Sequence, residues 1–156
     1  MLNAARAPQQ ALDHAGIAAR IPHAGRMCLL DRVVAWDEHR VLCAAGSHRD
    51  DDNPLREAGG LPVWAGIEYA AQAAAVHGTL LRQEEAPRRG VLAALRDVRA
   101  HRAWLHDIQE DLQIEAAILH ADPAGAVYAF ELSADGELLL VARFTLMFTG
   151  APGGKA

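Results

Sequence analysis

The chain has 156 residues, 51% of them hydrophobic, which predicts one folded domain with its own core and excludes a disordered chain. A net charge of -5 without an extended basic cluster leaves no surface for a phosphate backbone, so we expect no nucleic-acid partner. The expected domain spans residues 1–150. Residues 151–156, rich in glycine and proline, are expected to form a flexible tail.

The cysteines and the apolar runs indicate the compartment. Cys28 and Cys43 are the only cysteines, and both lie in apolar runs, which is typical of buried thiols in a reducing environment. The first ten residues lack the charged start and the continuous apolar core of a signal peptide, and no apolar run approaches membrane-spanning length. We therefore expect a cytoplasmic protein without membrane contact.

The first half of the chain is expected to begin with a short helix and continue as a hairpin. Residues 9–19 carry weak helical periodicity, and the proline and glycine in residues 21–25 break it. Two apolar segments, residues 27–36 and 40–47, follow and are joined by the polar residues 37–39. This pattern predicts two antiparallel strands.

The second half contains one long helix followed by strands. An alanine-rich helix is expected from about residue 64 to residue 81, because alanine is the strongest helix former. Four apolar or alternating segments come after it without a further helix, at residues 91–98, 111–120, 126–132 and 137–148. Turn residues between the last three predict an antiparallel meander. The element order favours an α+β fold in which an antiparallel sheet wraps around one long central helix.

Glu68 stands out in the alanine-rich helix because its neighbours are almost all small and apolar. Burying a lone carboxylate is costly, so the group pairs with another charge or its pKa rises. We expect a raised pKa and a chemical role for Glu68. The alternative is a partly solvated residue in the first turn, stabilised by the helix N-terminus.

Two motifs suggest a family. Residues 21–33 read Ile-Pro-His-Ala-Gly-Arg-Met-Cys-Leu-Leu-Asp-Arg-Val, and residues 66–72 read Gly-Ile-Glu-Tyr-Ala-Ala-Gln. Their order and separation resemble the hotdog-fold 3-hydroxyacyl-acyl carrier protein dehydratases of the FabA/FabZ superfamily. Residues 47–56 and 61–68 look closer to the branch associated with aryl-polyene pigment synthesis.

The resemblance implies a fold, an activity and partners. It implies a hotdog fold and dehydration of a 3-hydroxyacyl chain on acyl carrier protein to the trans-2-enoyl thioester, in aryl-polyene or fatty-acid-like biosynthesis. No cofactor and no metal are implied. The implied partners are the acyl carrier protein and a second hotdog subunit, in a homodimer or in a heterodimer with a paralogous dehydratase.

The resemblance assigns Glu68 to catalysis but leaves its partner open. Housekeeping members carry their catalytic histidine in a His-Phe-Pro-Gly loop just before the helix, and residues 55–65 contain no histidine. His48 begins the same strand-to-helix connection. His23 lies in the matching Pro-His motif, which is not the catalytic one in the housekeeping enzymes. Either histidine is a candidate base.

The chemistry requires a base and an acid facing the same two carbons. Histidine suits proton abstraction near neutral pH, and a protonated glutamate suits donation to the departing hydroxyl. Backbone N–H groups at the start of the helix, around Ala65, Gly66 and Ile67, are expected to bind the thioester oxygen. His77 lies nine residues after Glu68, on the opposite face of the helix, and is expected to be structural.

Two other functions remain open at this stage. A hotdog acyl thioesterase would use the same carboxylate to activate water and would release a free acid. A non-catalytic dehydratase-like subunit would stabilise an active paralogue, and the missing loop histidine keeps that interpretation open.

Overall fold

The computed structural model describes residues 11–83 and 89–149. The expected tail, residues 151–156, lies outside these residues. The helices and strands are α1 (His14–Ala18), β1 (Arg32–Trp36), β2 (Arg40–Ala45), α2 (Gly66–Arg82), β3 (Gly90–Ala100), β4 (Leu112–Asp122), β5 (Gly125–Ala134) and β6 (Glu137–Phe148). Three short 3-10 helices, η1 (Gly25–Met27), η2 (Ser47–Arg49) and η3 (Val63–Ala65), lie in the connections.

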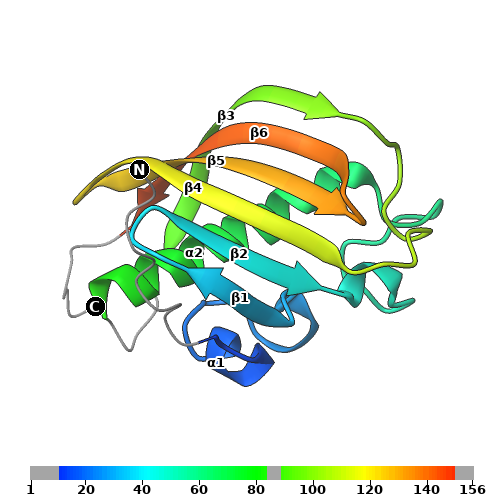
Figure 1. Cartoon of the computed structure of the whole chain (residues 1–156), viewed down its shortest axis with the longest axis horizontal. Coiled ribbons are helices and arrows are strands. Elements are labelled where there is room, and N and C mark those ends of the chain that lie inside the picture. Colours follow the sequence, from blue (N-terminus) through cyan, green and yellow to red (C-terminus); the bar gives the residue numbers. More distant parts are fainter. Residues whose placement is uncertain (1–10, 84–88, 150–156) are drawn as a thin grey trace.

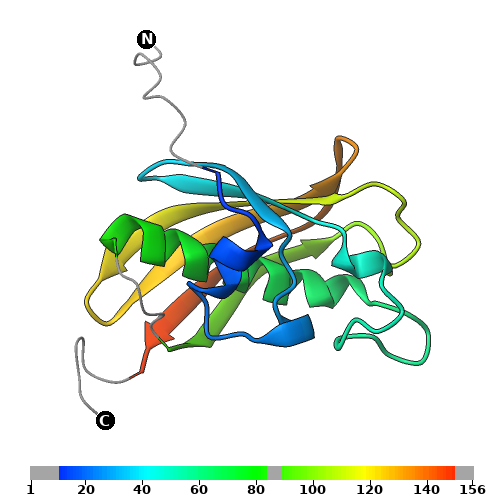
Figure 2. The same ribbon diagram turned by 90° about the horizontal axis from the view of Figure 1, so that it is seen from below.

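The strands form one six-stranded sheet in the order β1-β2-β4-β5-β6-β3, with every neighbouring pair antiparallel. The sheet curves around α2, the long helix in its hollow (Figure 1). Figure 2, which looks from below, shows α2 lying across one face of the sheet. The predicted α+β arrangement is confirmed, and so is the meander of β4, β5 and β6.

Two expected elements are shorter than predicted. The first helix is only α1, which begins after Asp13, whose carboxylate accepts a hydrogen bond from the Gly16 N–H at 2.8 Å. Residues 9 and 10 of that prediction lie outside the described residues. The first strand begins at Arg32 rather than at residue 27. The side chain of Gln72 on α2 hydrogen-bonds the backbone of residues 27 and 29, where a strand would bond a neighbouring strand. No pattern in the sequence predicts this contact.

The helix α2 is the centre of the core. Its small residues allow close packing, and Ala70, Ala73 and Ala74 are buried against the sheet together with Tyr69 and Val76. Gln83 ends the helix in the left-handed conformation, with φ of 54°. The buried side chains from Gly66 to Thr79 therefore hold one face of α2 against the core.

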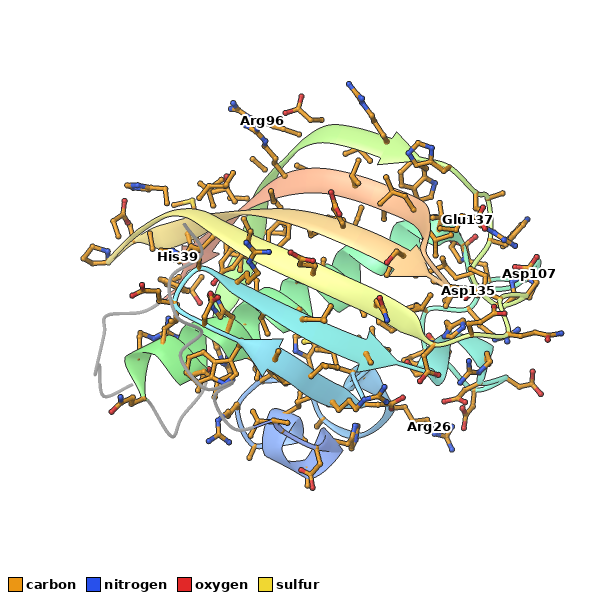
Figure 3. All side chains as sticks on the ribbon, viewed as in Figure 1. Arg26, His39, Arg96, Asp107, Asp135 and Glu137 are labelled. Carbon is orange, nitrogen blue, oxygen red and sulfur yellow. The ribbon has the colours of Figure 1, made fainter. Side chains whose placement is uncertain are left out.

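Aromatic rings on β5 and β6 complete the core, and charged groups lie outside it. Tyr128 stacks on Phe144 with ring centroids 5.9 Å apart. Charged side chains such as Arg96, Asp107 and Glu137 project outward from the periphery (Figure 3). Within residues 11–83 and 89–149, no helix is long and apolar enough to cross a membrane.

Candidate active site

His23 and Glu68 form a direct pair. Their Nε2 and Oε1 atoms are 2.9 Å apart, and their side chains are 26% and 33% exposed. His23 lies in the bend between α1 and η1, and Glu68 lies in the first turn of α2. Nδ1 of the same ring is buried and has no hydrogen-bond partner among the described residues. Nε2 is therefore the ring nitrogen that a bound molecule can reach together with the carboxylate.

Gln72 holds the two halves of this pair together. Its amide nitrogen donates to the Met27 carbonyl oxygen at 2.6 Å, and its amide oxygen accepts from the Leu29 N–H at 2.9 Å. The same nitrogen lies 3.4 Å from Oε1 of Glu68. One turn of helix separates Gln72 from Glu68, so both side chains lie on one face of α2. The amide thus fixes the segment that carries His23 against the turn that carries Glu68.

The electrostatics of Glu68 differ from the expectation. The hydrogen bond from His23 lowers the pKa of Glu68, while partial burial opposes this effect without overcoming it. The predicted rise in pKa is wrong for this structure, because the sequence does not show that a histidine 45 residues away lies in contact. Glu68 is a carboxylate at neutral pH in the open site.

A cavity of about 440 Å³ begins at this pair and runs along α2. Its walls come from α2 on one side and from β3, β4, β5 and β6 on the other. Most of the lining is apolar, including Ala71, Ala75, Leu92, Ile118, Ala126 and Leu146. Such a space accepts an extended apolar chain and offers it few hydrogen-bonding groups.

His48 lies elsewhere. Its side chain is fully buried, and its Nε2 atom is 3.0 Å from the carbonyl oxygen of Ile108. Burial lowers the pKa of His48, the largest of several effects on it. His48 ties η2 to the segment before β4 and is not part of the cavity lining. The structure brings His23, not His48, to Glu68.

The start of α2 does not offer the expected free N–H groups. The Ala65 N–H donates to Pro62 at 3.0 Å, and the Gly66 N–H is taken up by the turn of η3. Gly66 packs on the sheet instead, because a methyl group there would lie 2.6 Å from Cδ2 of Leu132. The expectation is therefore wrong for Ala65 and Gly66, since a 3-10 turn precedes the helix. The role of Ile67 stays a prediction.

Other polar side chains lie near the site, and of these His77 has an expected role from the sequence. His77 is buried, as expected for a structural residue, and bonds the Tyr128 hydroxyl at 2.8 Å and the Asp37 carbonyl oxygen at 2.7 Å. Gln72 was visible as part of the second motif, and its spacing of four from Glu68 is the signal that could have assigned it. Arg82 and Tyr128 line the cavity, and no local pattern places them there.

Comparisons with known proteins extend these observations. The dehydratase heterocomplex ApeI:P from Xenorhabdus doucetiae matches with a TM-score of 0.76 and 27% identity, covering 86% of this chain and 91% of that chain. A mutant thioesterase from Pseudomonas aeruginosa matches with a TM-score of 0.63 and 17% identity, covering 91% and 97%. A hypothetical thioesterase with coenzyme A from Streptococcus pneumoniae gives 0.55 and 16%, covering 76% and 85%. No curated protein matches.

These likenesses and the sheet wrapped around α2 define a protein of the hotdog fold, as the sequence predicted. The two thioesterases are 17% and 16% identical to this chain, so their similarity shows the fold alone. The chain belongs to the ApeP-like family, described as ApeP dehydratase, which it matches over residues 15–150. This match places it among the hotdog dehydratases.

Proposed function

We propose that the protein removes water from a 3-hydroxyacyl chain on acyl carrier protein and forms the trans-2-enoyl thioester. The observation that carries the proposal is the contact of 2.9 Å between His23 and Glu68 beside an apolar cavity. Family membership supports the dehydratase class. The carrier-bound substrate and a place in aryl-polyene or fatty-acid-like synthesis are part of the proposal.

In the proposed reaction the two side chains share one proton. In the open site Glu68 is the carboxylate, because the hydrogen bond from His23 lowers its pKa. An acyl chain that fills the cavity removes water from the pair, and loss of water disfavours separated charges. The proton then moves to Glu68, which leaves Nε2 of His23 as a base and Glu68 as an acid.

Elimination follows from that neutral pair. Nε2 takes the proton from the carbon beside the thioester carbonyl, the carbon–oxygen bond breaks, and Glu68 protonates the departing hydroxyl as water. Transfer of the new proton from His23 to Glu68 restores the neutral pair from which the elimination starts. Every atom is accounted for by substrate, product and water, so the step needs no redox partner.

The proposed assembly is a heterodimer with a paralogous hotdog protein. Among the described residues, the edge strand β3 pairs with β6 on one side and has no strand on the other, and Val91, Leu92 and Leu95 on it are exposed apolar side chains. Leu92 also lines the cavity, so a subunit added at β3 would cover the site. The heterocomplex of the solved relative supports this partner.

Thioester hydrolysis is the second candidate. The lowered pKa of Glu68 keeps a carboxylate beside the cavity, and a carboxylate can activate water toward a thioester carbonyl. This reaction would release a free acid and the carrier thiol.

One assay separates the candidates. The purified chain, alone and with its paralogue, is incubated with a 3-hydroxyacyl carrier protein, and the carrier is followed by mass. Loss of one water supports dehydration, and loss of the acyl group supports hydrolysis. Activity that needs the paralogue and survives loss of Glu68 would identify a non-catalytic subunit.

Variants test the residue assignment. We expect Glu68→Gln and His23→Ala to lower the turnover number about 10²- to 10⁴-fold, the usual contribution of a positioned acid or base. His48→Gln, which keeps a donor for the Ile108 carbonyl, should retain the turnover number of the folded protein. Full activity of Glu68→Gln would refute the mechanism.

A further inference from the structure

A second link joins α2 to the segment that follows His23. Leu29 is fully buried, and its carbonyl oxygen accepts a hydrogen bond from Oγ of Ser47 at 2.7 Å. The same Oγ lies 2.7 Å from the hydroxyl oxygen of Tyr69, the residue that follows Glu68 on α2. Two hydrogen bonds through Ser47 thus connect the helix turn that carries Glu68 with Leu29.

The direction of each hydrogen bond in this link follows from the donors that are available. Ser47 has one hydroxyl hydrogen and donates it to the Leu29 carbonyl, so toward Tyr69 its oxygen accepts and the phenol donates. The amide nitrogen of Asn53 donates to the Tyr69 oxygen at 3.1 Å and to the Ser47 carbonyl oxygen at 2.9 Å. Burial raises the pKa of Tyr69, so the phenol keeps its hydrogen at neutral pH. The Tyr69 hydroxyl is therefore a bonded junction between α2, η2 and the loop that contains Asn53.

This junction lies beside the catalytic pair but outside the cavity. Tyr69 is fully buried, and the cavity that begins at Glu68 is lined by neither Tyr69 nor Ser47 nor Asn53. An acyl chain in the cavity therefore does not touch the phenol. The hydrogen bonds of Tyr69 act on the arrangement of the protein alone.

We propose that Tyr69 is a positioning residue, whose hydroxyl holds the segment after His23 where His23 can contact Glu68. The inference rests on the proposed function, because it takes these two side chains as the reacting groups. The serine side chain is short, so Oγ of Ser47 reaches Leu29 and Tyr69 together only when the three backbones are correctly placed. Without the phenol, Ser47 keeps its bond to Leu29 and loses its anchor on α2.

Tyr69→Phe removes the hydroxyl and keeps the ring. Ser47 still donates to the Leu29 carbonyl, and Asn53 still donates to the Ser47 carbonyl, so we expect the variant to fold. With a 3-hydroxyacyl carrier protein as substrate, and with the paralogue where the two form a complex, its turnover number should fall about tenfold, because small displacements of reacting groups are costly. Its KM should not change, because the phenol does not line the cavity.

A variant of η2 tests the same link from its other end. Ser47→Ala breaks the bonds to Leu29 and to Tyr69, so its turnover number should fall at least as far as that of Tyr69→Phe. The double variant should be no slower than Ser47→Ala alone, because both changes break one link and their effects are not additive.

A second measurement does not depend on turnover. The hydrogen bond from His23 lowers the pKa of Glu68, so displacement of His23 should raise that pKa in Tyr69→Phe. Carbon NMR titration of the protein with labelled glutamate follows this pKa, and Glu68→Gln identifies the signal. Ile114→Val shortens a buried side chain of β4 outside the cavity lining and is the control for lost stability alone. It should lower the thermal midpoint and leave both the turnover number and the pKa of Glu68 unchanged.

The outcomes separate this inference from the proposed function. A wild-type turnover number or an unchanged pKa of Glu68 in Tyr69→Phe overturns the role of Tyr69, and so does an equal loss of turnover in Ile114→Val. The same criteria apply to Ser47→Ala if Tyr69→Phe does not fold. If the wild type dehydrates no carrier-bound substrate while the pKa of Glu68 still rises in Tyr69→Phe, the positioning role is supported and the proposed reaction is refuted.

Discussion

Removing the amide of Gln72 should loosen the whole site. In Gln72→Leu, the buried Leu29 N–H and the Met27 carbonyl lose partners that lie 2.9 and 2.6 Å away. A buried backbone group left without a partner costs about 1–3 kcal/mol, so the loss of two partners is expected to lower the free energy of unfolding by about 2–6 kcal/mol. A domain of this size tolerates such a loss and still folds at room temperature.

The loss of the amide should also lower the turnover number. Gln72 bonds the segment just after His23 to α2, and Thr79 bonds the Arg20 carbonyl oxygen just before it, so loss of the Gln72 amide is expected to displace Nε2 from Glu68. A displacement of about 1 Å can cost about 10²-fold in rate. Gln72→Glu tests the reasoning further, because it keeps an acceptor for the Leu29 N–H and places a second carboxylate beside Glu68. We expect it to be more stable than Gln72→Leu and equally inactive.

Urea unfolding and dehydration rates, measured where each variant is fully folded, check these expectations. Gln113→Leu is the matched control, because Gln113 is exposed on β4 and its loss should change the free energy of unfolding by less than about 0.5 kcal/mol. The argument fails if Gln72→Leu unfolds at the same urea concentration as Gln113→Leu, or if it keeps the wild-type turnover number.

Two further predictions concern pH and the glycines of α2. The pKa of Glu68 is lower in the folded state than its ordinary value of 4.5. The contribution of ionised Glu68 to the free energy of unfolding is therefore complete above pH 4.5 and is lost as the pH falls through the folded pKa. Urea midpoints taken between pH 7 and pH 3 should therefore drop more for the wild type than for His23→Ala, and identical drops would contradict the pair. Gly66→Ala should lower the thermal midpoint, because its methyl group meets Leu132 at 2.6 Å, at a cost of about 1–3 kcal/mol. Gly78→Ala meets only the flexible end of Arg82 and should raise stability by up to about 1 kcal/mol; melting curves that rank the two in the opposite order would contradict this packing.

Local patterns account for most of the fold. Alanine-rich periodicity predicted α2 to within two residues, and the alternating segments with their turns predicted β4, β5 and β6. These elements depend on neighbours close in sequence, so sequence patterns identify them. Residues 27–30 are apolar and resemble the start of a strand, yet a side chain from α2 bonds residues 27 and 29 instead.

The site depends on contacts that no local pattern contains. Glu68 stands out in the sequence as a candidate site residue because a carboxylate among alanines is unusual. Its partner could only be narrowed to two histidines, since the distance between His23 and Glu68 depends on how the first segment packs on the helix. The lowered pKa of Glu68 and the engaged N–H groups at the start of α2 follow from the same tertiary contacts.

The single amide of Gln72 also makes the site a sensitive indicator of native packing. The residues it joins are far apart in the chain, so His23 meets Glu68 only where the segment around residues 21–29 is packed on α2. Closing such a long loop has an entropic cost that only the final contacts repay. A small local opening near residues 21–29 is thus expected to lower activity without unfolding the sheet.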